Sequence, residues 1–154
     1  MKAYAQKNPH SYTNHAINTM AEASSLEKKA QNVIQALTKP FINEAETTLN
    51  KMEKILSDID FLQQKEKDRL IKGLFFQMAH DLKGQGATYG FPLITRLSAH
   101  ICTLINEEKS YSVQTIKIFK SDIDDMQKII KYPPNEPDLK LTKKIINRLE
   151  CKSE

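Results

Sequence analysis

Apolar residues recur every three or four positions over most of the chain, which is the spacing of one face of an α-helix. Four such stripes stand out, and their members are Phe41, Ala45, Leu49, Met52, Leu56 and Ile59; Leu70, Ile71, Leu74, Phe75, Met78 and Leu82; Leu93, Leu97, Ile101 and Leu104 or Ile105; and Ile116, Phe119, Ile123, Met126 and Ile130. No alternating strand pattern of useful length occurs, and four glycines leave little hairpin chemistry. The chain is therefore predicted to be all-α.

Capping residues, prolines and glycines divide these stripes into helices. A serine pair followed by Glu27 predicts that regular structure begins at Ser24 or Ser25, and Pro40 predicts a break before a second helix. Gly90 predicts a left-handed helix end, with Pro92 in the opening turn of the next helix. The expected helices cover about residues 25–37, 39–59, 65–88, 92–108, 112–130 and 138–150. This order predicts an up-and-down four-helix bundle with additional N-terminal and C-terminal helices.

Length and composition indicate one domain. The chain has 154 residues, and we expect a flexible segment over residues 1–23 and a single helical domain over residues 24–154. Cys102 and Cys151 lack metal-type pairing, and no stretch has the character of a signal peptide or membrane span, so a cytoplasmic protein with free thiols is expected. The net charge of +4 is spread along the helices, which favours an acidic protein partner over nucleic acid or membrane.

All four glycines lie between Gly73 and Gly90, inside a strongly helical segment. A glycine within a helix costs about 1 kcal/mol relative to alanine, which suggests that something approaches the backbone closely. On a helical wheel, His80 lies opposite the apolar stripe. The residues that share its face are Arg69, Gly73, Phe76, Lys83, Gly84 and Ala87.

An isolated exposed histidine on a helix usually has no function, so the residues around His80 decide between its possible uses. A helical metal site needs a second ligand three or four residues on, and Lys83 and Gly84 hold those positions, so no metal is expected. A hydrolytic relay needs a serine or cysteine nucleophile within one turn, and none is present. An anion on the imidazole fits better, because Lys83 supplies a cation and Gly84 leaves room. His10, His15 and His100 are assigned to no site.

The segment Ala79–Phe91, A-H-D-L-K-G-Q-G-A-T-Y-G-F, resembles the motif of the histidine-containing phosphotransfer (HPt) domains of bacterial phosphorelays. The family pattern is H-x-x-K-G, then small residues and a glycine ten positions after the histidine. The continuation P-L-I-T-R-L-S-A-H-I-C resembles the next helix of small, free-standing alphaproteobacterial members. The resemblance covers about residues 41–131 and is strong over 77–104; one departure is Gln85, where many members carry a small residue.

The resemblance implies a relay function without autonomous kinase activity. His80 would be the phosphoacceptor, exchanging a phosphoryl group with aspartates of response-regulator receiver domains or of a hybrid histidine kinase. The receiver would supply Mg²⁺, so the chain is expected to need no cofactor of its own. The chain is also expected to be monomeric. The expected roles are phosphate contact for Lys83, Gly84 and Gln77, partner docking for Arg69, Gly73, Phe76 and Ala87, and structural support for Gly86 and Gly90.

Two alternatives stay open. H-D-L-K also resembles the phosphorylated box of the sensor histidine kinase dimerisation helix, but the proline usual five residues after the histidine is Gln85 here, and Gly84 is foreign to that box. No nucleotide-binding domain follows in the sequence. The second alternative is a helical adaptor that binds partners without chemistry.

Overall fold

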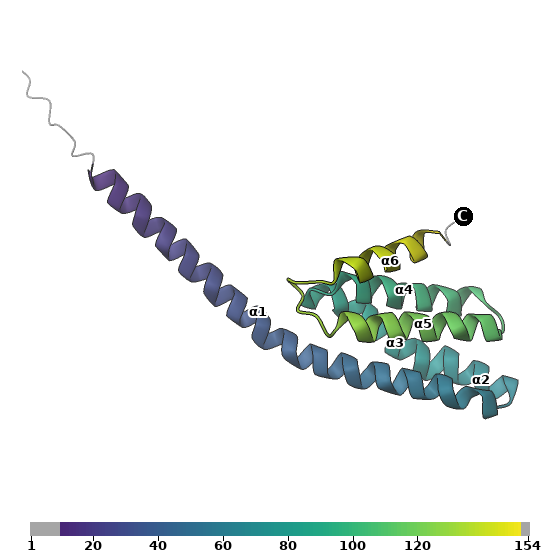
Figure 1. Cartoon of the computed structure of the whole chain (residues 1–154). Helices are drawn as coiled ribbons and strands as arrows, with labels where there is room; N and C mark the ends of the chain where they lie inside the picture. Colours follow the sequence, from purple (N-terminus) through teal and green to yellow (C-terminus); the bar gives the residue numbers. More distant parts are fainter. Residues whose placement is uncertain (1–9, 152–154) are drawn as a thin grey trace, which may run out of the picture. The chain divides into compact units, whose positions relative to one another are not determined.

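Every regular element is helical in the computed structural model, which describes residues 10–151 (Figure 1). The elements in chain order are α1 (His10–Asp58), η1 (Ile59–Phe61), α2 (Gln64–Leu70), η2 (Ile71–Phe75), α3 (Phe76–Gly86), η3 (Ala87–Tyr89), α4 (Pro92–Glu107), α5 (Val113–Ile129) and α6 (Leu139–Glu150). No strand occurs in this part of the chain, so the predicted all-α class is confirmed.

Internal contacts divide the chain into two units, one up to Leu37 and one from Thr38 onward. Helix α1 crosses this boundary. In the first unit, every residue from Ala16 to Leu37 is exposed. The second unit contains the hydrophobic core, to which α1 contributes its C-terminal part.

Both ends of the predicted first helix were wrong. Helix α1 begins at His10 instead of Ser24 or Ser25, and it continues through Pro40 without a break. Residues 10–39 contain neither glycine nor proline, so no residue in this range stops the helix. Pro40 removes only one N–H donor, and helix-forming residues on both sides propagate the helix past it. Residues 1–9 of the predicted flexible segment lie outside the described residues.

The core of the second unit is built from the predicted stripes of α1, α4 and α5. All six positions from Phe41 to Ile59 in the first stripe are buried, as are all five from Ile116 to Ile130. In α4 the predicted positions Leu97, Ile101 and Ile105 are buried, but Ile94 is buried in place of Leu93, which is only half-buried, as is Leu104. Helix α6 adds the fully buried Ile145.

The stripe of the helix that carries His80 was predicted incorrectly at Leu74. This side chain is 52% exposed, and Leu70 and Met78 are only half-buried. Ile71, Phe75 and Leu82 are buried as predicted, and Ala79 and Gly86 are buried as well. Residues 71–75 form the π-helical turn η2, which takes up more residues per turn than an α-helix. At 100° per residue the buried positions fall within about 80° of one another and Leu74 lies about 100° from their centre, so the predicted stripe was centred too far toward Leu70 and Leu74.

Two glycines fix the junction between α3 and α4. Gly90 adopts the left-handed conformation expected of a helix end, with φ 89°, and its N–H donates to the carbonyl of Ala87 at 3.1 Å. A Cβ on Gly86 would lie 2.8 Å from Oγ1 and 2.9 Å from the backbone N of Thr95, so α4 packs directly on the backbone here. The Thr95 hydroxyl also accepts from the N–H of Ala87 at 2.8 Å and donates to the carbonyl of Lys83 at 3.1 Å. The C-terminal end of α3 is thus tied to the first turns of α4.

Candidate functional site

His80 lies on the exposed side of α3, opposite the buried Ala79 and Leu82. Lys83 and Gly84 stand one turn further along and are exposed as well. A Cβ placed on Gly84 would meet no atom within 4 Å. This glycine therefore does not serve packing within the fold, and the space beside the imidazole is open to a large partner.

Phe76 supports the imidazole from the preceding turn. Its ring centroid lies 6.0 Å from that of His80, with an angle of 29° between the ring planes. The wheel placed Phe76 on the fully exposed face, whereas the side chain is half-buried and packs against the edge of the core. The ring therefore restricts the directions in which the imidazole can turn, and it leaves an aromatic edge at the surface.

Gln77 already has a side-chain partner. Its amide Nε2 donates to Oδ1 of Asp81 at 2.8 Å, and both residues are exposed. A phosphoryl oxygen beside His80 would have to compete with this carboxylate for the amide. The structure thus gives the expected phosphate contact of Gln77 no direct support.

The remaining expected docking positions are all at the surface. Arg69 in α2, Gly73 in η2 and Ala87 in η3 are exposed, and a Cβ on Gly73 would also meet no atom within 4 Å. Leu74 is exposed as well, although the sequence prediction placed it in the core. We call His80 with Arg69, Gly73, Phe76, Lys83, Gly84 and Ala87 the His80 surface.

The charge of Lys83 reaches the neighbouring helix α4. Burial raises the pKa of the Cys102 thiol, and the positive charge of Lys83 acts on it in the opposite direction. The thiol stays protonated at neutral pH because burial has the larger effect. Cys102 is therefore an inert core residue and no candidate nucleophile.

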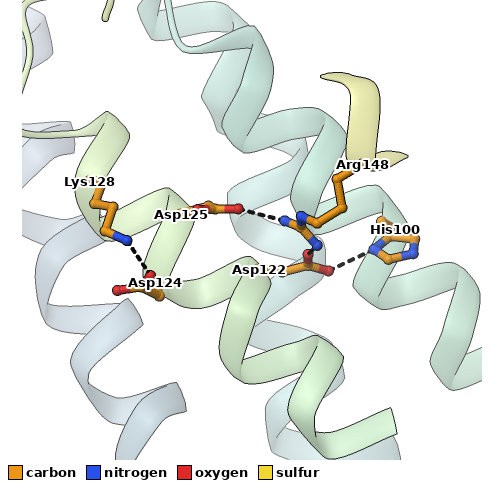
Figure 2. Close-up of polar contacts among 6 residues, drawn as sticks. All are labelled: His100, Asp122, Asp124, Asp125, Lys128 and Arg148. Carbon is orange, nitrogen blue, oxygen red and sulfur yellow. Dashed lines mark hydrogen bonds and ion pairs between the residues drawn. The ribbon is translucent and has the colours of Figure 1, made fainter. Parts of the chain in front are cut away.

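A second group of polar side chains, which sequence analysis did not identify, lies between α4, α5 and α6 (Figure 2). Asp122 accepts from Nη1 of Arg148 at 2.6 Å and pairs with Nδ1 of His100 at 2.7 Å. Asp125 accepts from Nη2 of the same arginine at 2.6 Å. We call these four residues the Asp122 cluster.

The Asp122 cluster holds α6 in place. The Asp122 side chain is completely buried and that of Asp125 is 5% exposed. Burial opposes the charged form of Arg148, but the hydrogen bonds and charges of the two carboxylates outweigh it and raise its pKa. The guanidinium is therefore always charged and pairs two carboxylates that would otherwise be buried alone. His100, which the sequence left without a role, belongs to this support.

No group of three or more histidine, cysteine, aspartate or glutamate side chains within the described residues is arranged to hold a metal ion. None of the helices in this part of the chain combines the length and the apolar character needed to cross a membrane. Comparisons with protein-family models, with curated proteins and with solved structures found no match. The functional argument therefore rests on the geometry of the chain itself.

Proposed function

We propose that this protein is a histidine phosphotransfer protein of a two-component phosphorelay, in which His80 accepts a phosphoryl group from a receiver-domain aspartate and passes it on. The observation that carries the proposal is the contrast between two glycines of one helix. Gly86 is packed against Thr95, whereas Gly84, one turn after His80, faces open space beside an exposed imidazole and a lysine. A glycine that the fold does not need is explained by a partner that approaches His80 closely.

The proposal also includes the arrangement of the helices as a four-helix bundle. The C-terminal part of α1, the segment α2 to α3, α4 and α5 supply the core and would form an up-and-down four-helix bundle, with α6 as an addition. In such a bundle one helix can present a histidine to solvent at mid-length while its other face holds the core. Ala79 and Leu82 on the core side of α3 agree with this role.

The proposed chemistry is an in-line displacement at phosphorus. A nitrogen of the neutral imidazole attacks the aspartyl phosphate, an N–P bond forms, and the acyl P–O bond breaks, so that the aspartate leaves as a carboxylate. The receiver would bring Mg²⁺ and its own lysine. This chain contributes the nucleophile, the cation of Lys83 and an unobstructed approach past Gly84. Positioning and charge neutralisation supply most of the acceleration in transfers of this kind.

The test is phosphoryl transfer to the purified full chain. Receiver domains from the same organism are charged with radiolabelled acetyl phosphate, freed of excess label, and mixed with the protein. We expect one or more receivers to lose label to this chain in an acid-labile, alkali-stable form, and we expect no label from ATP alone. Binding of receivers without transfer would instead support the adaptor alternative, and failure of every receiver to transfer would refute the proposed function.

Replacing Lys83 by alanine should slow transfer about 10- to 100-fold, which corresponds to about 1.4 to 2.7 kcal/mol of barrier. The reason is that Lys83 is one cation beside a partner site that already carries positive charge. Single-turnover transfer measures the effect. Lys120→Ala on α5, also an exposed lysine, is the matched control and should transfer at the normal rate. An unchanged rate for Lys83→Ala would make this lysine an ordinary solvated residue.

Substitutions at Gly84 should separate folding from transfer. Gly84→Ala should stabilise the helix by up to about 1 kcal/mol, because alanine is the better helix former and the added methyl group meets no atom. Gly84→Leu should also fold, yet transfer to it should fall sharply, because the branched side chain obstructs a docked receiver. Thermal melting and transfer rates are measured for both variants.

The control for this experiment is Gly86→Ala, whose methyl group would clash with Thr95 and should lower the melting temperature. Two results would contradict the access role of Gly84. One is loss of folding in Gly84→Leu, and the other is a normal transfer rate in the folded variant.

A further inference from the structure

The first unit of the chain carries an apolar face that no residue of the described chain covers. All residues from Ala16 to Leu37 in α1 are exposed. They include four large apolar side chains whose exposed fractions are 74% for Met20, 66% for Leu26, 58% for Val33 and 57% for Leu37. Most helical stability in proteins comes from packing of an apolar face, so burial of this face against another element would stabilise the helix.

The apolar residues follow a seven-residue repeat. Ala16, Ala23, Ala30 and Leu37 are seven residues apart, and Leu26 and Val33 follow the second and third of them by three positions. This is the a and d spacing of a coiled coil, in which the a positions are apolar throughout and the first d position is Thr19. We call these six residues the N-terminal seam.

We propose that the N-terminal seam pairs with the same seam of a second copy of the chain, in antiparallel orientation, so that the protein is a homodimer. Residues 16–37 carry two glutamates and two lysines, Glu22, Glu27, Lys28 and Lys29, so their formal charge is zero and two copies do not repel.

The sizes of the seam residues favour the antiparallel orientation. With the centre at residue 28, Ala23 is level with Val33 of the other copy, and Ala30 is level with Leu26. Each layer then combines a small and a large side chain, which fills the space between two helices evenly. A parallel pair would stack alanine on alanine and leucine on leucine, which gives alternately thin and thick layers.

This inference replaces the monomer expected from the sequence, and it is independent of the proposed phosphotransfer. The seam lies in the unit up to Leu37, whereas the His80 surface belongs to the unit from Thr38 onward. A failed transfer assay would therefore not count against the dimer, and a single-chain mass would not count against phosphotransfer.

Sedimentation equilibrium of the full chain tests the dimer. We expect the mass of two chains, and a shift to one chain in the variant Leu26→Asp, Val33→Asp, because four buried carboxylates would then face one another. The matched control, Ser25→Asp with Asn32→Asp, adds the same charges on the opposite face of the helix and should remain dimeric. A single-chain mass for the wild type at all concentrations, or a dimeric seam variant, would overturn the proposal.

Disulfide trapping tests the orientation in a Cys151→Ser background, since Cys102 is buried. In the antiparallel register, position 27 lies about 3 Å along the axis from its own copy, whereas position 20 lies about 24 Å from its own copy. Glu27→Cys should therefore cross-link under mild oxidation and Met20→Cys should not. Efficient cross-linking of Met20→Cys would overturn the antiparallel arrangement.

Discussion

Replacing His80 by glutamine should abolish acceptance of a phosphoryl group from a charged receiver domain, with a loss of at least about 1,000-fold, or about 4 kcal/mol of barrier. The glutamine amide nitrogen has no nucleophilic lone pair, so the N–P bond cannot form. His80 is exposed and its α-helical position accepts glutamine readily, so the variant should fold and melt as the wild type does. Label transfer in single-turnover reactions, together with thermal melting, provides the measurement.

The matched control for this experiment is His100→Gln. His100 is the other histidine of the second unit, but its Nδ1 is engaged with Asp122 in the cluster that holds α6. This variant should lose stability and still accept label. Label on the His80→Gln protein would show that the phosphoacceptor is a different residue. Loss of label in a folded His100→Gln would show that transfer depends on the Asp122 cluster.

Replacing Arg148 by alanine should lower the free energy of unfolding by about 3 kcal/mol or more. The change leaves the carboxylates of Asp122 and Asp125 buried without their cation, and the uncompensated charge costs more than the ion pairs themselves contribute. Urea denaturation at neutral pH gives the value. We also expect α6 to lose its fixed position on α5, because Arg148 of α6 forms the hydrogen bonds to both aspartates of α5 (Figure 2).

Lys128→Ala is the control for Arg148→Ala. Lys128 pairs with Asp124, but that pair lies at the surface within one helix, and its removal should hardly change the free energy of unfolding. A loss below about 1 kcal/mol for Arg148→Ala would mean that the two aspartates are solvated or protonated once the arginine is gone.

Helical periodicity was sufficient to predict most of the core. The buried positions of α5 and of the C-terminal part of α1 follow the pattern read from the sequence, because regular α-helices keep one residue spacing along their whole length. Leu74 was misassigned because its apolar side chain was counted in the stripe, although it lies about 100° from the centre of the buried positions on a helical wheel. The start of α1 was misplaced because the residues before Ser24 were expected to be irregular, and the serine pair was then interpreted as an N-terminal cap.

The candidate site could be predicted only where its residues are neighbours on one helix. His80, Lys83 and Gly84 were found from their spacing, and the open space at Gly84 agrees with the expected access. The Asp122 cluster was missed because Asp122 and Arg148 are 26 positions apart in the sequence. Considered one at a time, each looks like an ordinary charged residue at the surface. Only the packing of α6 against α5 shows that they are buried together.

The contact between Gly86 and Thr95 shows which positions near His80 the fold requires and which positions can be substituted. Thr95 and the backbone of α3 fix the end of the His80 helix from the inside, so its position does not depend on any side chain of the outer surface. Exposed positions such as Arg69 and Ala87 can therefore be exchanged without repacking the core. Under the proposed function, a lineage could change its receiver partner by a few single substitutions on this surface, each nearly neutral for folding, while the imidazole stays where it is.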